Sequence, residues 1–78
     1  MQRFFFDLME DDVSVADLNG VLMPELDKAE LEAAGAIAQM MADRLSRASH
    51  HQMAVVIRDS ARIPVAKVSL TLTRERMS

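Results

Sequence analysis

The middle of the chain, residues 24–48, reads PELDKAELEAAGAIAQMMADRLSRA and has the pattern of one long amphipathic helix. The acids Glu25 and Asp27 occupy its first turn and the bases Arg44 and Arg47 its last, so both pairs complement the helix dipole. At about 100° per residue, one set of apolar side chains forms a continuous first ridge: Leu26, Ala33, Ile37, Met40 and Met41. We expect this first ridge to pack on a sheet.

A second apolar ridge runs beside the first: Leu31, Ala34, Ala38, Ala42 and Leu45, with Gly35 close to it. The combined apolar arc is wider than one sheet covers, which makes the second ridge a candidate contact with another protein surface. Gly35 has no side chain and permits close backbone approach there. The alternative is that alanines occupy an exposed helix face for their helix propensity alone.

The residues before the helix predict a β-hairpin. Residues 3–9, RFFFDLM, place aromatic side chains at period two, which is typical of a strand with one face on a core. In that arrangement Phe5 lies on the other face and is expected to stay partly exposed. Residues 13–15 predict a short partner strand, and residues 17–20, DLNG, predict a turn because Asn and Gly tolerate positive φ.

The residues after the helix predict a second hairpin. Residues 49–51 form a connector, a third strand alternates over residues 53–58, residues 59–62 turn the chain, and a fourth strand follows. Pro64, near the start of the fourth strand, removes a backbone donor and so indicates a sheet edge or a bulge. The chain is therefore predicted to be a single small α+β domain over residues 1–78, with a ββαββ order. We expect a four-stranded antiparallel sheet of order 2-1-3-4 with one long helix packed on one face.

Charge is sorted along the chain. Residues 1–43 hold ten acids against two bases, whereas residues 44–78 hold seven bases against two acids. Oppositely charged halves suit docking on each other, or on a second copy, better than docking on nucleic acid or a basic partner. The chain has no cysteine, which favours a reducing compartment, and no apolar run is long enough to span a membrane. We therefore expect a cytoplasmic protein.

Several short motifs follow one another in a distinctive order. The chain opens with Arg3-Phe4-Phe5-Phe6-Asp7, continues through residues 17–20 and residues 22–29, LMPELDKA, and ends with an alanine-rich helix and a hairpin turning at residues 59–62. In this order the motifs resemble a family of small bacterial proteins that carry a domain of unknown function and open with an Arg-aromatic-aromatic-Phe-Asp strand. The resemblance covers most of the chain. It implies a compact ββαββ arrangement and no established activity, so it assigns no catalytic residue.

The sequence supports no catalytic, metal or cofactor site. His50 and His51 are the only histidines, and neighbours in an extended chain point to opposite sides, which is poor geometry for holding one metal ion. The acids of residues 10–17 lack the loop spacing of a calcium site, and no glycine-rich nucleotide motif is present. We therefore predict a protein that is not an enzyme and that uses no cofactor.

The leading functional prediction is a non-enzymatic module that binds a second copy or a partner protein, with no role at a membrane. We expect a homodimer that forms through a sheet edge or through the second helix ridge; the candidate ridge residues are Leu31, Ala34, Gly35, Ala38, Ala42 and Leu45. The alternative is a nucleic-acid-binding regulator that uses the basic second hairpin; its candidate residues are Arg58, Arg62 and Lys67. Against the alternative stand a pI of about 5.2 and the lack of an aromatic residue for base stacking in the basic half.

Overall fold

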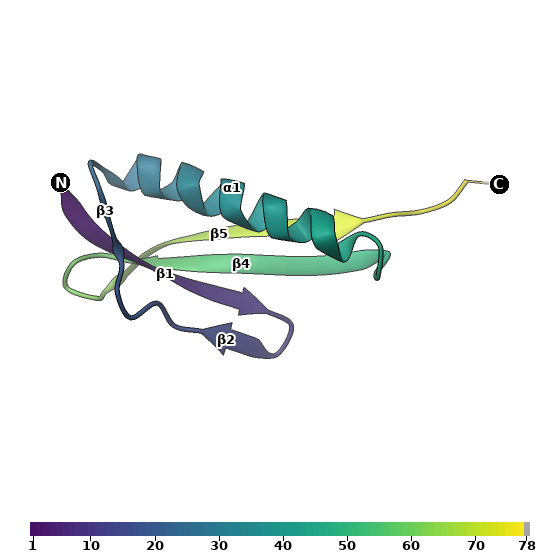
Figure 1. Cartoon of the computed structure of the whole chain (residues 1–78), viewed down its shortest axis with the longest axis horizontal. Coiled ribbons are helices and arrows are strands. Elements are labelled where there is room, and N and C mark those ends of the chain that lie inside the picture. Colours follow the sequence, from purple (N-terminus) through teal and green to yellow (C-terminus); the bar gives the residue numbers. More distant parts are fainter. Residues whose placement is uncertain (78) are drawn as a thin grey trace.

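The computed structural model describes residues 1–77, which form one helix and an antiparallel sheet of five strands (Figure 1). In chain order the elements are β1 (Gln2–Glu10), β2 (Val13–Val15), β3 (Val21–Met23), α1 (Leu26–Arg44), β4 (His50–Arg58) and β5 (Pro64–Thr73). The strand order is β2-β1-β4-β5, and β3 also pairs with β1. The predicted α+β class, with one helix and an antiparallel sheet, is confirmed.

The expected four-stranded order 2-1-3-4 is corrected by an additional short strand. β2 pairs with residues 8–10 at the end of β1, whereas β3 pairs with residues 2–4 at its start. Counted along the chain, the order is therefore 2-1-4-5, with strand 3 also beside strand 1. Residues 13–23 thus run antiparallel along β1 as two short strands separated by a loop. A three-residue strand directly before the helix leaves too short a pattern for the sequence to reveal it.

The core lies between α1 and one face of the sheet. Its largest fully buried side chains come from β1, α1 and β4: Phe4, Ile37, Met53 and Ile57. The first helix ridge is confirmed as part of this core, since Ala33, Ile37 and Met41 are buried and Leu26 and Met40 pack against them. Alternation along β5 places four apolar side chains on the same face of the sheet: Ala66, Val68, Leu70 and Leu72.

Two predicted boundaries differ from the structure. α1 is shorter at both ends than residues 24–48, and a turn over residues 45–47 follows it. β4 begins at His50 instead of Met53, because His50 and His51 pair with the last residues of β5. The two histidines therefore belong to a strand and not to a connector.

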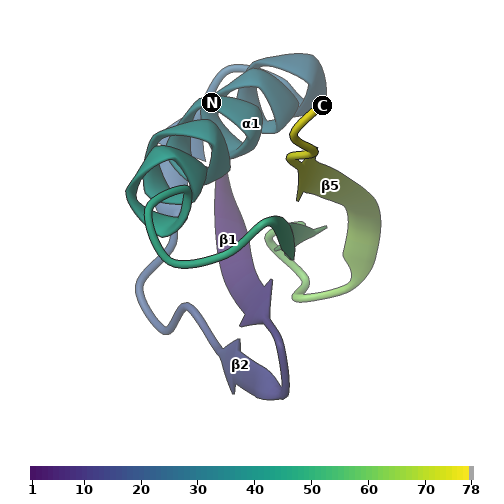
Figure 2. The same ribbon diagram turned by 90° about the vertical axis from the view of Figure 1, so that its right-hand side faces the viewer.

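β5 is an edge strand, as Pro64 predicts. It pairs with β4 along one side, and the register shifts between Ile57 and Arg58, where Arg58 stands opposite Pro64. Figure 2 shows α1 on one side of the sheet, and within residues 1–77 no second helix lies on the other side. Within residues 1–77, no helix combines the length and the apolar character that a membrane span requires.

Candidate interaction surface

α1 presents an apolar face on the side away from the sheet. We call it the outer helix ridge and define it by the six predicted residues: Leu31, Ala34, Gly35, Ala38, Ala42 and Leu45. All six are exposed, with Leu31 at 67% and Leu45 at 39%. Leu45 follows the last helical residue but keeps helical angles, with φ of −57° and ψ of −34°, and so stays in line with the ridge. The structure therefore brings all the predicted ridge residues together on one surface.

The period of the helix explains why this face is exposed. Every fourth residue of α1 is buried against the sheet: Ala29, Ala33, Ile37 and Met41. The ridge residues lie roughly half a turn away from these positions and therefore face outward. A carbon atom added at Gly35 would meet no atom from elsewhere in the chain within 4 Å, so the helix backbone is accessible there.

Arg58, a candidate residue of the nucleic-acid alternative, is bound inside the fold. Its Nε donates to Asp7 Oδ2 at 2.7 Å, and its Nη2 donates to Asp7 Oδ1 at 2.9 Å. The same Nη2 donates to the carbonyl oxygen of Asp17 at 3.0 Å. The hydrogen bonds from Arg58 hold the pKa of Asp7 below its usual value. One guanidinium therefore connects β1, β4 and the loop between β2 and β3.

Phe5 is buried, which corrects the expectation that it stays partly exposed. It is only 4% exposed, and the guanidinium carbons of Arg58 and Arg62 lie 5.0 Å and 4.9 Å from the centre of its ring. These are cation–π contacts from β4 and from the turn that follows it. The alternation within β1 correctly placed Phe5 on the face away from the helix, but it carried no information about the distant arginines that cover the ring.

The other two basic candidates are exposed but are not adjacent. Arg62 lies over Phe5 in the turn before β5, whereas Lys67 lies farther along β5, opposite Val56. The structure thus brings Arg58 and Arg62 together on one aromatic ring and places Lys67 apart from them. The three basic candidates therefore do not share one surface, whereas the six residues of the outer helix ridge do.

Asp17 organises the loop between β2 and β3. Its Oδ2 accepts a hydrogen bond from the Phe6 N–H at 3.1 Å, and its Oδ1 accepts from the N–H groups of Asn19 and Gly20 at 3.1 Å and 3.0 Å. Its own N–H donates to Asp7 Oδ1 at 2.9 Å. Burial raises the pKa of Asp17, but the backbone hydrogen bonds outweigh burial and the pKa is lowered. The sequence predicted this turn and missed its contact with β1.

A second charged cluster joins the end of α1 to the sheet. Arg44 donates from Nε and Nη2 to the carboxylate of Glu10 at 2.7 Å and 2.9 Å. His51 Nε2 lies 2.6 Å from Glu10 Oε2. The hydrogen bonds from Arg44, followed by that from His51, lower the pKa of Glu10 from 4.5 to about 2. The sequence suggested a dipole role for Arg44, but its partner lies 34 residues earlier in the chain.

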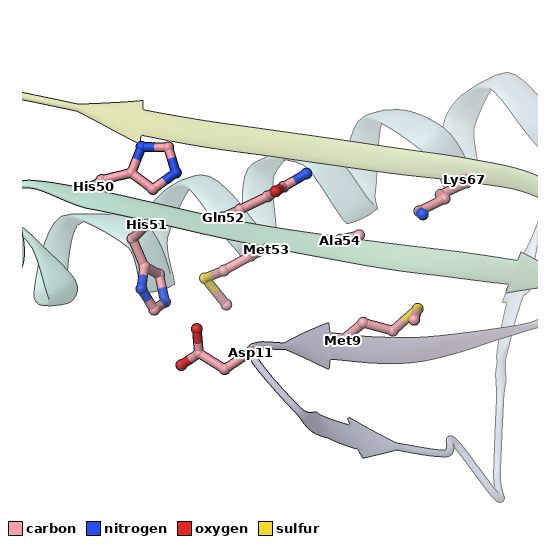
Figure 3. Close-up of a pocket in the computed structure, with 8 residues that line it drawn as sticks. All are labelled: Met9, Asp11, His50, His51, Gln52, Met53, Ala54 and Lys67. Atoms are coloured by element: carbon pink, nitrogen blue, oxygen red, sulfur yellow. The ribbon is translucent and has the colours of Figure 1, made fainter.

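A hollow of about 340 Å³ lies beside this cluster, near the end of β1 and the start of β4. Figure 3 shows the residues that line it: Met9, Asp11, His50, His51, Gln52, Met53, Ala54 and Lys67. His50 and His51 point to opposite sides of β4, and Lys67 lies at the other end of the hollow (Figure 3). His50 Nδ1 is 3.4 Å from the hydroxyl of Thr73, whereas His51 faces Glu10. Among residues 1–77, no three His, Cys, Asp or Glu side chains gather in a way that suits a metal ion.

The ion pairs join the two oppositely charged halves of the chain. Asp7 binds Arg58 and Glu10 binds Arg44, so each pair takes its acid from the first half and its base from the second. These contacts neutralise, within one molecule, part of the charge that is separated along the chain. Other charges remain at the surface of the helix, where Asp27 and Glu32 are exposed near its start.

Acid should destabilise the fold over the range in which Glu10 titrates. Its pKa is lower in the folded state than in the unfolded chain, so its stabilising contacts are complete above pH 4.5 and are lost as the pH falls to about 2. Within that range, unfolding should take up as much as about one proton at Glu10. We expect Glu10→Gln to remove this uptake and to flatten the decline of the unfolding free energy with pH, leaving the smaller contributions of Asp7 and Asp17. Urea titrations at a series of acidic pH values measure this, and identical pH profiles for the two proteins would contradict the assignment.

The chain matches a protein family over residues 3–71, from the start of β1 into β5, and the family is described as a domain of unknown function (DUF6894). This confirms the resemblance to an uncharacterised domain family. No curated protein and no solved structure matches the chain.

Proposed function

The chain belongs to the family described as a domain of unknown function (DUF6894), and we propose that it is a non-enzymatic interaction module that self-associates as a homodimer. The observation that supports this most strongly is the outer helix ridge. It combines two exposed leucines with small residues between them, on the only layer that covers the sheet in the described chain. An apolar helix face that points away from its own core indicates a second surface that covers it.

The two leucines set the apolar energy available at this face. Complete burial of an exposed leucine contributes about 1.5–3 kcal/mol, and because Leu31 is 67% and Leu45 39% exposed, burying the rest of both contributes about that amount per protomer in total. Part of that gain offsets the loss of translational and rotational freedom on association. We therefore expect a reversible dimer and not a permanent one.

The charged clusters support a role without catalysis. Asp7 accepts a two-point contact from Arg58, and Glu10 accepts one from Arg44, so both carboxylates already serve the fold. Beside the Glu10 cluster, His50 lies 3.4 Å from the exposed hydroxyl of Thr73, but the described residues give His50 no second side-chain partner that would orient it as a base, and His51 is paired with Glu10. Both ion pairs therefore have a structural role.

The nucleic-acid alternative stays a prediction, as do a bacterial origin and a cytoplasmic location. The alternative has less support than self-association, because Arg58 is paired with Asp7 and Lys67 lies apart from Arg62. A dimer through the free edge of β5 stays the second candidate for self-association. That edge is ten residues long and pairs with β4 on one side only.

Substitution of Ala38 tests the ridge against a matched position on the same helix. Ala38→Glu places a charge in the middle of the outer helix ridge and should reduce dimer formation at least tenfold, because the carboxylate loses water on association. Ala36→Glu makes the same chemical change at an exposed position off the ridge and should leave the dimer intact. Light scattering after size exclusion gives the mass of each variant, and circular dichroism checks that both keep their helix. A dimeric mass for both variants would rule out the ridge as the interface.

A further inference from the structure

The spacing of the outer helix ridge is nearly the same when it is read in either direction along the helix. Five of its members, at positions 31, 35, 38, 42 and 45, follow one another at alternating intervals of four and three residues. That is the spacing of a seam between two packed helices. A leucine stands at each end of the seam, and Gly35, Ala38 and Ala42 occupy its middle. Ala38 is therefore the centre of an almost symmetric sequence.

From this pattern we propose that the partner is a second copy of the chain, with the two α1 helices antiparallel about a two-fold axis at Ala38. This inference rests on the proposed self-association. The two-fold axis places Leu31 of one protomer beside Leu45 of the other, at both ends of the contact. Gly35 lies beside Ala42 of the other protomer, and the two Ala38 residues face each other. Small residues at the centre permit an interaxial distance near the lower end of about 8–10 Å.

Charge selects the antiparallel direction over the parallel one. The first half of α1 and its cap contain four acids and one base: Glu25, Asp27, Glu30, Glu32 and Lys28. A parallel pair would place these acidic halves side by side, and like charges on neighbouring helices repel. An antiparallel pair separates the two acidic halves and places each along the C-terminal end of the other protomer's helix, where Arg47 is exposed and Arg44 is paired with Glu10. The two helix dipoles are also opposed in this arrangement, which is favourable.

The size of the contact sets the expected affinity. A helix of 19 residues is about 28 Å long, so a ridge about 10 Å wide on each of two helices buries roughly 600 Å² in total. Stable complexes bury about 1,200–2,000 Å², so we expect a reversible dimer that dissociates on dilution. In such a dimer the helices lie inside and the sheets outside. The uncovered sheet face and the β5 edge of each protomer then stay accessible on opposite sides of the assembly.

Engineered cysteines test the geometry, and the chain has no cysteine of its own that would interfere. Ala38→Cys should form a disulfide-linked dimer under mild oxidation, because the two Cα atoms near the axis lie within reach of a disulfide. Leu31→Cys alone should not, because the two copies of position 31 would lie about 21 Å apart along the helices. A mixture of Leu31→Cys and Leu45→Cys proteins should again be linked. Ala36→Cys, exposed but off the ridge, measures linking by random collision.

The outcomes separate this inference from the proposed function. Linking of Ala38→Cys well above the Ala36→Cys level, with linking of the mixed pair, supports the antiparallel dimer. Self-linking of Leu31→Cys overturns the antiparallel arrangement in favour of a parallel one. A dimeric mass of the unmodified chain with no linking at any ridge position overturns the ridge geometry but leaves self-association, through β5, in place. A monomeric mass without linking overturns both proposals.

Discussion

Phe4→Ala should destabilise the protein by about 3–5 kcal/mol, the largest loss expected from a single substitution. Phe4 is 2% exposed and belongs to the same cluster as Ile37, Met53 and Ile57. Truncation removes most of an aromatic side chain and leaves a cavity between α1 and the sheet, which the neighbouring residues fill only in part. A chain of 78 residues has an unfolding free energy of roughly 4–12 kcal/mol, so this loss consumes much or all of it.

Urea unfolding at one fixed protein concentration measures the effect, because a dimer makes stability depend on concentration. Phe4→Leu is the matched control; it keeps most of the apolar volume and should lose only about 1–1.5 kcal/mol. Leu22→Ala, at a half-exposed site on the adjacent β3, should change the urea midpoint little. A loss below about 1 kcal/mol for Phe4→Ala would show that Phe4 does not hold the helix and the sheet together.

Asp17→Ala should cost about 2–3 kcal/mol, the second-largest effect, because one carboxylate accepts three backbone hydrogen bonds. Phe6 lies in the part of β1 that pairs with neither β2 nor β3, and the substitution removes the acceptor of its N–H on that side. The loop also depends on Gly20, which has φ of 71°; a Cβ there would lie 2.9 Å from the carbonyl oxygen of Phe4. Loss of Asp17 should therefore loosen the edge of β1 as well as the turn.

Asp17→Asn separates the shape of the side chain from its charge. One amide oxygen can still accept from Asn19 and Gly20, but the amide nitrogen would face the Phe6 N–H, donor against donor. We expect an intermediate loss of stability for this variant. Hydrogen exchange of the Phe6 amide, followed by NMR, should accelerate in both variants. An unchanged exchange rate in Asp17→Ala would contradict the role assigned to Asp17.

Short-range sequence patterns predicted the helix and four of the five strands. Period-two alternation in β1 and β5 and the 3.6-residue period of α1 depend only on neighbouring residues, so the core ridge and the outer helix ridge were both predictable. Pro64 likewise indicated the edge strand through its missing donor. The extra strand β3 was missed because Val21–Met23 is too short to show a period.

Contacts of long range were not predictable from the sequence. The charge of Arg58 suggested nucleic acid, but its partner Asp7 lies 51 residues earlier and appears only when β1 and β4 pair. The burial of Phe5 by Arg58 and Arg62 has the same origin. His51 was assigned to a connector, but it belongs to β4, where it pairs with Leu72, and its side chain faces Glu10, 41 residues earlier. The sorted charges of the two halves gave a general indication of such pairs without identifying them.

The mass of the unmodified chain in solution tests the central claim most directly. Sedimentation equilibrium over a range of protein concentrations, at low and at high salt, follows the change from the 8.7 kDa chain to twice that mass. The outer helix ridge predicts a dimer that forms with increasing concentration and persists at high salt, because apolar burial is not screened by ions. A chain that stays monomeric up to about 1 mM under both conditions would contradict self-association. A dimer that forms only at low salt would contradict the ridge and point instead to pairing between the charged halves.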